Sequence, residues 1–301
     1  MQTTGIITEI KRYAIHDGPG IRTTIFVKGC PLRCTWCSSP ETWEPYPQIY
    51  FKAISCKEFG DCIKACPVDA ITMNKNYKID RDRCTLCIKC VEACNSGALV
   101  TVGRIVTSED VVREIEKDIV FYKKSGGGAT ISGGEPLFQP HFVSRILKLC
   151  HKKGIHTVLD SSGYAKPEHV KQVLENVDLV LLDLKHMDPI MHKDYTGVSN
   201  ELIIENAKLM AKKCKMRISL PLIKGINDSE ENIKKTIEFT KSLGIECIDV
   251  EPFHALGESK YEMLGMKNPF HDFEEVSSQE VNKVIEIIQS AGLRATRGRT
   301  M

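Results

Sequence analysis

From residue 104 onward, short apolar runs alternate with segments of helical periodicity. Each run is rich in β-branched residues and ends in a loop of small or polar residues, which is the pattern of a buried strand. Together with an earlier run at 23–27, the predicted strands are residues 128–132, 155–160, 177–183, 216–223 and 247–253. The predicted helices are residues 108–124, 139–153, 166–177, 200–214, 229–244 and 277–292. Six successive βα units predict an α/β fold in which helices wrap a parallel sheet.

Six units are fewer than the eight of a complete TIM barrel, so we expect an open, partial (β/α)6 TIM-like barrel. A flat, doubly wound sheet is the competing interpretation. Functional residues of such barrels lie at the carboxyl ends of the strands. The polar clusters that follow the predicted strands are the cysteines after residue 27, SGGEP (132–136), DSSG (160–163), DLKH (183–186) and EPFH (251–254). Arg217 lies on the fifth predicted strand, and we count it among the cofactor-binding candidates.

Charge and hydropathy exclude two classes of partner. The 41 Lys and Arg residues nearly balance the 39 Asp and Glu residues, and no basic run suggests nucleic acid or an anionic membrane. The first residues lack the apolar segment of a signal peptide, and no window approaches 18 uninterrupted apolar residues. We therefore expect a cytoplasmic, monomeric protein.

Cysteine usage indicates metal chemistry. Ten of the thirteen cysteines lie between Cys30 and Cys94, and clustered thiols in a reducing compartment are ligands more often than disulfides. The other three, Cys150, Cys214 and Cys247, are predicted to be ordinary core or surface residues. The loop GCPLRCTWCSSPE, residues 29–41, offers only three thiols, at Cys30, Cys34 and Cys37. A structural metal site normally has four protein ligands, so something else must supply the fourth.

Residues 47–103 differ in character from the rest of the chain and predict a separate ferredoxin-like domain, inserted into a barrel formed by 1–46 and 104–301. The segments CKEFGDCIKACPVDAI and CTLCIKCVEACNSGAL are two copies of one pattern. The second copy has the C-x2-C-x2-C-x3-C spacing that binds [4Fe–4S] clusters in bacterial ferredoxins. A zinc ribbon is the alternative interpretation.

In ferredoxins with two clusters, the fourth cysteine of each copy serves the other cluster. This rule predicts one auxiliary cluster bound by Cys66, Cys84, Cys87 and Cys90. The first copy has Phe59 where its second cysteine would stand. The remaining cluster then has only Cys56, Cys62 and Cys94, so the chain is predicted to hold one or two auxiliary clusters.

A C-x3-C-x2-C loop directly after a barrel strand, with GGE after the next strand, resembles the radical S-adenosylmethionine (SAM) superfamily. The resemblance implies that three thiolates bind three irons of a site-differentiated [4Fe–4S] cluster. The amino and carboxylate groups of SAM would chelate the fourth iron, and this would explain the missing protein ligand.

The resemblance extends over nearly the whole chain. HDGPGIRTTIF, the ferredoxin-like insertion, SGGEPL, DLKHMD and EPFHALGESKY together resemble the glycyl-radical enzyme activating enzymes. These oxidoreductases cleave SAM reductively to a 5′-deoxyadenosyl radical, which abstracts a hydrogen atom from a backbone glycine of a partner enzyme. The resemblance therefore implies a glycyl-radical enzyme as protein substrate and flavodoxin or ferredoxin as electron donor.

The resemblance also implies roles for single residues in cofactor binding. Trp36 would lie against the adenine. The SAM amino group would meet Gly133, Gly134 and Glu135. A monovalent cation near the SAM carboxylate would be held by Asp160, Ser161 and Asp183. For each residue, a capped strand end or a surface polar group is the structural alternative.

Three residues are implied as catalytic. Lys185 would act with Asp183 as the Asp-x-Lys pair of the activating enzymes, and His254 would close over the SAM side. Asp17 lies in the loop that would meet the substrate glycine, and we expect residues 16–22 beside the cysteine loop. Two other functions remain open here: a radical SAM enzyme with a small-molecule substrate, and an electron-transfer ferredoxin fused to an inert barrel.

Overall fold

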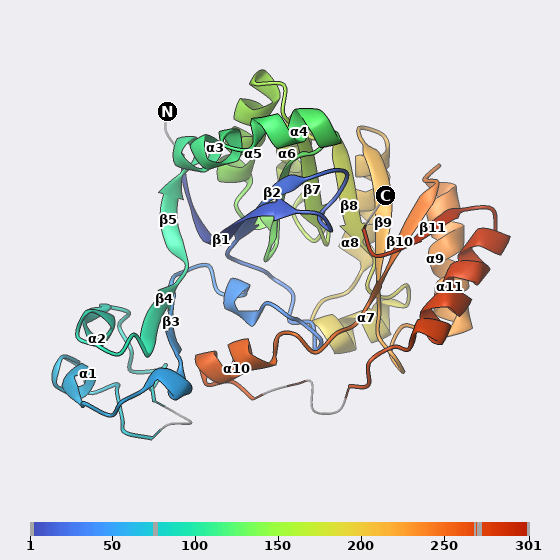
Figure 1. Ribbon diagram of the computed structural model, residues 1–301. Coiled ribbons are helices and arrows are strands. Elements are labelled where there is room, and N and C mark those ends of the chain that lie inside the picture. Colours follow the sequence, from blue (N-terminus) through green and yellow to red (C-terminus); the bar gives the residue numbers. More distant parts are fainter. Residues whose placement is uncertain (1–2, 75–77, 268, 270–272, 300–301) are drawn as a thin grey trace.

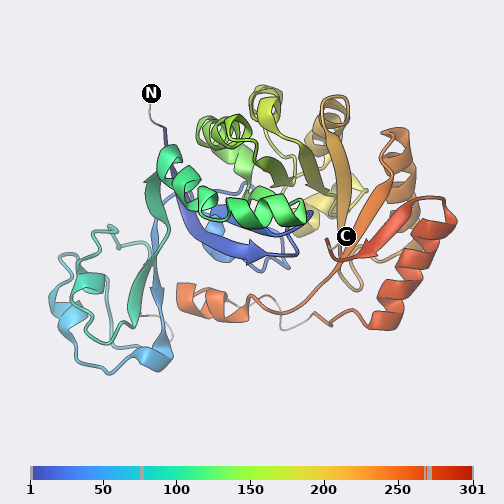
Figure 2. The ribbon, with the colours of Figure 1, turned by 45° about the horizontal axis from the view of Figure 1, so that its top comes forward.

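The computed structural model describes residues 3–74, 78–267, 269 and 273–299, and its main sheet has nine strands (Figure 1). Their order across the sheet is β11-β10-β9-β8-β7-β6-β2-β1-β5. All six predicted strands are present as parallel neighbours: β2 (Arg22–Val27), β6 (Gly128–Gly133), β7 (His156–Ser161), β8 (Leu179–Asp183), β9 (Lys215–Leu222) and β10 (Cys247–Pro252). The two edge strands do not pair with each other, and the sheet curves as an open arc (Figure 2). The predicted partial barrel is confirmed.

Three strands extend the sheet beyond the prediction. At one edge, β1 (Thr4–Ala14) pairs antiparallel with β2, and β5 (Arg104–Thr107) pairs antiparallel with β1. At the other edge, β11 (Arg294–Arg297) pairs parallel with β10. The last strand therefore brings the carboxyl-terminal segment to the end of the sheet where β10 finishes.

The predicted helices correspond to α5 (Pro140–Lys152), α6 (Pro167–Val173), α8 (Glu201–Ala211), α9 (Glu230–Ser242) and α11 (Ser278–Ser290). The helix predicted over 108–124 is divided into α3 (Ser108–Glu116) and α4 (Ile119–Ser125). The division falls at Asp118, whose buried carboxylate accepts hydrogen bonds from Arg12 and Thr23 and so holds the chain against the sheet. The helices α7 (Pro189–Thr196) and α10 (Glu258–Leu264) were not predicted. Single 3₁₀ turns occur at Pro40–Thr42, Ala53–Ser55, Pro136–Phe138 and Leu174–Asn176.

The main core lies between the sheet and the helices on its outer face (Figure 2). Ile131 of β6, Leu182 of β8 and Ile218 of β9 are fully buried in it, as strands covered by crossover helices should be. Cys150 and Cys247 are also buried. In the described part of the chain, no helix is both long enough and apolar enough to cross a membrane.

Residues 47–103 contain a second sheet of two strands. Strands β3 (Gln48–Phe51) and β4 (Leu99–Val102) pair antiparallel, and the short helices α1 (Asp61–Lys64) and α2 (Lys89–Glu92) lie between them in sequence. A small apolar cluster around Ile49 and Leu99 is separate from the main core. Figure 1 shows this part below β5 and away from the helices that cover the barrel.

Candidate functional site

A pocket with a cavity volume of about 110 Å³ lies where β2, β6, β7 and β8 end, at the carboxyl edge of the sheet. The pocket is lined by Cys30, Leu32, Cys34, Cys37, Thr42, Trp43, Ser132, Gly133, Gly134, Asp160, Ser161, Ser162, Asp183 and Lys185. It therefore unites the cysteine loop with the polar clusters predicted after three other strands.

The cysteine loop is held by elements distant from it in sequence. The backbone N–H of Cys30 donates to the carbonyl of Trp43 at 3.0 Å, and that of Arg33 donates to the carbonyl of Thr196, at the end of α7, at 2.8 Å. The Tyr261 hydroxyl, on α10, donates to the carbonyl of Cys37 at 2.9 Å. The two unpredicted helices thus fix the backbone that carries the thiols.

The three thiols lie together in a protected place. Burial raises the pKa of the Cys34 thiol to about 12, and it also raises the pKa of Cys30 and Cys37. Each of these pKa values is raised further by another thiol of the set or by a nearby carboxylate. Binding of an iron–sulfur cluster as thiolates would therefore release protons.

In the part of the chain that the structure describes, no three Cys, His, Asp or Glu side chains form a ready cage for a single metal ion. A cubic cluster keeps its ligands farther apart than one ion does. Three adjacent soft donors that line an open pocket suit a cluster with one exposed iron.

Gly133 and Gly134 allow β6 to end against β2. A Cβ atom at Gly133, whose φ is +111°, would lie 2.4 Å from the backbone nitrogen of Val27. One at Gly134 would lie 2.5 Å from the carbonyl oxygen of Gly29. Because backbone cannot move aside as a side chain can, both positions require glycine. The two glycines consequently present bare backbone to the pocket.

Glu135 is fully buried and does not line the pocket. Its carboxylate accepts hydrogen bonds from the backbone N–H of Leu137 and the hydroxyl of Ser161 on one oxygen, at 3.0 and 2.7 Å. The other oxygen accepts from the backbone N–H and the hydroxyl of Ser162, at 2.9 and 2.5 Å. In this structure Glu135 joins the ends of β6 and β7.

Asp160 and Asp183 stand at the ends of β7 and β8 and share a cation that was not predicted. Arg299 donates to Asp160 Oδ2 at 2.7 Å and to Asp183 Oδ1 at 2.9 Å. Lys185 donates to Asp183 Oδ2 at 3.0 Å, and the Ser132 hydroxyl donates to Asp160 Oδ2 at 2.6 Å. The expected Asp-x-Lys pair is therefore formed, beside a guanidinium.

The two carboxyls differ in their charge environment. Burial raises the pKa of Asp160, although Arg299 opposes this effect. Burial also acts to raise the pKa of Asp183, but Lys185 and Arg299 outweigh it and hold that pKa below its usual range. Burial lowers the pKa of Lys185, whereas Asp183, Cys34 and Cys30 together raise it by more, so the ammonium stays protonated. Asp183 and Lys185 form a charged pair inside the pocket.

Two residues implied by the resemblance lie outside this pocket. Trp36 is 7% exposed and packs in an apolar cluster with Tyr195, at 6.4 Å between ring centroids, whereas Trp43 lines the pocket. His254 is exposed, and its Nδ1 lies 3.6 Å from a Glu275 carboxylate oxygen. Trp36 lies within the cysteine loop and Trp43 lies just after it, and Trp43 lines the cavity.

Arg217 is also outside the pocket. It lies near the amino end of β9, where it pairs with the buried Asp249, and it lines a different cavity at the start of the strands. A residue at the amino end of a parallel strand cannot reach ligands at the carboxyl end. We therefore do not retain Arg217 among the cofactor-binding candidates.

Residues 16–22 lie at the other end of β2 from the cysteine loop, which differs from the expected position beside it. The physical reason is chain direction: this loop precedes β2, whereas the cysteines follow it. Asp17 nevertheless reaches the inner face of the sheet, where it accepts a hydrogen bond from Thr24 at 2.7 Å. Its carbonyl accepts one from Thr130 on β6. Arg22, fully buried, anchors the loop to the carbonyls of Pro19 and Ala129.

Four cysteines within residues 47–103, Cys66, Cys84, Cys87 and Cys90, lie close together. Burial raises the pKa of Cys90 to about 11, and the nearby Cys84, Cys66 and Cys87 raise it further, in that order. The backbone N–H of Ala70 donates to the Cys66 sulfur at 3.2 Å. The set offers four soft donors, which is what a fully cysteine-ligated cluster needs.

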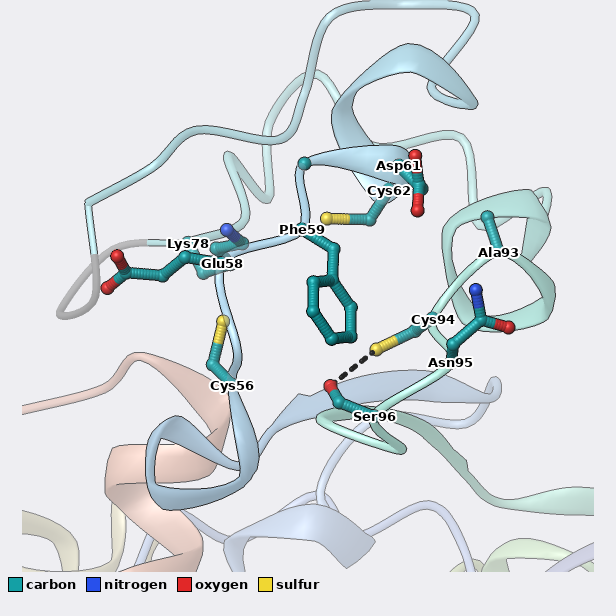
Figure 3. Close-up of a pocket in the computed structure, with 11 residues that line it drawn as sticks. Cys56, Glu58, Phe59, Asp61, Cys62, Lys78, Ala93, Cys94, Asn95 and Ser96 are labelled. Atoms are coloured by element: carbon teal, nitrogen blue, oxygen red, sulfur yellow. Dashed lines mark hydrogen bonds between the residues drawn. The ribbon is translucent and has the colours of Figure 1, made fainter.

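The other three thiols line one pocket together with Phe59 (Figure 3). The Cys94 sulfur lies 3.5 Å from the Ser96 hydroxyl. Burial raises the pKa of Cys62, and the nearby Cys94 and Cys56 raise it further, although a nearby lysine lowers it. Figure 3 shows the Phe59 ring pointing into the space between the sulfurs. An aromatic ring thus projects into the place where a fourth ligand would be needed.

Comparison with known proteins agrees with this geometry. Residues 24–239 match the family model of the radical SAM superfamily, and the chain belongs to that superfamily. It is 44% identical over 272 residues to the (2S)-3-sulfopropanediol dehydratase activating enzyme of Klebsiella oxytoca, and this match covers 87% of this chain and 86% of the relative. It is 40% identical over 277 residues to the isethionate sulfite-lyase activating enzyme of Oleidesulfovibrio alaskensis, with 89% of each chain covered. Within the superfamily, this chain belongs to the glycyl-radical enzyme activating enzymes.

The fold itself has solved relatives. The structure of Streptococcus suis SuiB bound to precursor peptide SuiA matches with a TM-score of 0.56 at 15% identity, over 94% of this chain and 49% of that one. At that identity the likeness concerns the fold alone.

Proposed function

We propose that the pocket at the carboxyl edge binds SAM beside a [4Fe–4S] cluster held by Cys30, Cys34 and Cys37. The observation that supports this most directly is that these thiols share one cavity with Gly133, Asp183 and Lys185. When bound, the cluster and SAM would supply the chemistry: one electron from the reduced cluster would cleave SAM to methionine and a 5′-deoxyadenosyl radical, which would take a hydrogen atom from the partner's glycine to give 5′-deoxyadenosine and a glycyl radical.

The chain's own residues bind and orient SAM and the substrate glycine. Bare backbone at Gly133 and Gly134 accepts hydrogen bonds from the SAM amino group, and Lys185 places a positive charge beside Cys34. Asp183 fixes the Lys185 ammonium at 3.0 Å. Burial of the loop excludes water from the reacting atoms. Asp17, on the inner face of the sheet, contacts the substrate glycine, and His254 closes over SAM when the partner docks.

The proposal is tested anaerobically on the reconstituted protein. After reduction with dithionite, 5′-deoxyadenosine should form from SAM, and a glycyl-radical enzyme encoded beside this gene should gain a radical detectable by electron paramagnetic resonance. Lys185→Met should slow cleavage, whereas Lys193→Met, an exposed substitution on α7, should leave it unchanged. Turnover of a small molecule without any glycyl radical would overturn the proposal.

Residues 47–103 are proposed to form a ferredoxin-like domain with one or two auxiliary clusters. Two observations support it: the four-thiol set around Cys90 and the three-thiol pocket around Phe59. The clusters conduct electrons from flavodoxin or ferredoxin, and a cytoplasmic monomer suffices for this task. A zinc ribbon would contain zinc instead of acid-labile sulfide, which elemental and sulfide analysis distinguishes.

The substrate is proposed to be a protein backbone. An open arc leaves room for a polypeptide loop, whereas a metabolite needs a pocket that buries most of its surface. The glycine loop must be ordered on binding, at a cost of several kcal/mol that contacts along the arc offset. A short peptide with the partner's glycine should therefore be a much weaker substrate than the intact partner.

A further inference from the structure

Three carboxylates from three strands converge on one guanidinium. Asp160 ends β7, Asp183 ends β8 and Glu251 lies near the end of β10. Arg299 Nη1 and Nη2 donate to the two aspartates at 2.7 and 2.9 Å, and its Nε lies 3.5 Å from a Glu251 oxygen. Nη2 also donates to the Ser219 hydroxyl at 3.0 Å. Only 13% of the Arg299 side chain is exposed, so this cation is enclosed by the site.

The segment after β11 is shaped to deliver this side chain. Gly298 has a φ of +71°, which an L side chain rarely adopts, and its N–H donates to the Val250 carbonyl at 2.8 Å. Its carbonyl accepts a hydrogen bond from the Thr296 hydroxyl at 2.8 Å. The chain therefore turns at a fixed point after the edge strand, and Arg299 extends past β10 and β9 to reach β7.

We propose that Arg299 is the resident countercation of the Asp160–Asp183 pair and replaces the alkali metal ion that the family resemblance implies there. The guanidinium then offsets the repulsion between these aspartates and the SAM carboxylate. The inference deepens the proposed function, because it concerns the same pocket.

The oxygen atoms that an alkali ion would need are already used. Asp160 Oδ2 accepts from Arg299 and Ser132, and the oxygens of Asp183 accept from Arg299 and Lys185. The Ser161 hydroxyl oxygen accepts a hydrogen bond from the Gly163 N–H at 2.9 Å. Among the described residues, Asp160 Oδ1 is the aspartate oxygen of this pair that has no hydrogen-bond partner. One oxygen is too few, because hard cations take several oxygen ligands.

The guanidinium supports the pocket without closing it. Arg299 is not one of the described residues that line the cavity, whereas Asp160 and Asp183 are. It approaches the aspartates from the β10 side, where Glu251 and Ser219 lie. A ligand carboxylate can therefore enter the cavity while the positive charge stays behind the aspartates.

The first test needs no SAM. Thermal unfolding of the protein is compared in potassium chloride and in choline chloride at equal ionic strength. Wild type and Arg299→Lys should unfold at the same temperature in both salts. Arg299→Gln should be less stable in choline and should recover partly in potassium. Arg297→Gln, which removes an equal charge from an exposed position two residues earlier, should respond to neither salt.

The second test measures SAM affinity of the cluster-loaded protein by equilibrium dialysis. Arg299→Gln should bind SAM at least about tenfold more weakly in choline chloride, with partial recovery in potassium, whereas Arg297→Gln should match wild type. The proposal would be overturned if the SAM affinity or the stability of wild type rose when potassium replaced choline. It would also be overturned if Arg299→Gln behaved like wild type in both tests. Absence of SAM binding by wild type in either salt would count against the proposed function, while the first test still decides the role of Arg299.

Discussion

Replacing Glu135 by Gln tests what its buried carboxylate does. Each carboxylate oxygen accepts one backbone N–H, from Leu137 or Ser162, and one serine hydroxyl. A glutamine amide has one acceptor oxygen, so in either orientation its NH2 group faces one of the two backbone N–H groups. The serine hydroxyls can rotate to accept, but the backbone donor cannot.

An unsatisfied buried donor costs about 1–3 kcal/mol, and hydrogen bonds to a charged acceptor are stronger than those to an amide. Burial raises the pKa of Glu135, which shows that the charged form pays for desolvation, and a neutral amide recovers part of that cost. We therefore expect Glu135→Gln to lower the free energy of unfolding by about 2 kcal/mol.

The assay is urea unfolding of the cluster-free protein near neutral pH. Glu205→Gln, an exposed substitution on α8, should change the free energy of unfolding by less than about 0.5 kcal/mol. A Glu135→Gln protein as stable as wild type that has lost SAM binding would refute the reasoning. That result would mean that the carboxylate serves the ligand and not the serines.

Three further predictions follow from the structure. Burial raises the pKa of Glu251 to about 7 from 4.5, so the folded chain keeps a proton that the unfolded chain releases. Stability should therefore fall by about 2 kcal/mol between pH 4.5 and about 7, and Glu251→Gln should remove this contribution in unfolding measured across that range. Cys34→Ala should abolish SAM cleavage but keep the iron–sulfur absorption of the insertion, and complete loss of iron would contradict the separation of the two sites. Phe59→Cys should raise bound iron toward about 12 per chain, and a wild-type spectrum with full cysteine ligation of both auxiliary clusters would contradict the proposed pairing.

The parts of the fold that sequence predicted are those with local signals. Strands β6 to β10 are short runs rich in aliphatic residues, and such runs indicate burial on both faces. By contrast, β11 reads RATR: it is a short edge strand with exposed arginines at both ends, so it has no apolar pattern to detect. The helices α7 and α10 are short, and neither has the long apolar periodicity of α5.

In the candidate site, too, the features with a local sequence signal were predicted and those without one were not. Cysteine spacing is local and was sufficient to predict the three-thiol loop. The choice between Trp36 and Trp43 depends on how the loop folds against α7 and α10, which spacing does not encode. Arg299 lies 139 residues from Asp160 in sequence, and a lone arginine after a glycine carries no signal for that contact.

The contact between Tyr261 and Cys37 has a consequence for the order of events during synthesis. The two residues are 224 positions apart, so at about 5–20 residues per second the hydroxyl leaves the ribosome roughly 10–45 s after the loop that it secures. Through that interval the three thiols are presented by a nascent chain whose loop still lacks its anchor on α10. A protein that delivered iron during translation would meet a flexible cysteine loop, whereas one that delivered iron after release would meet a loop already anchored by Tyr261.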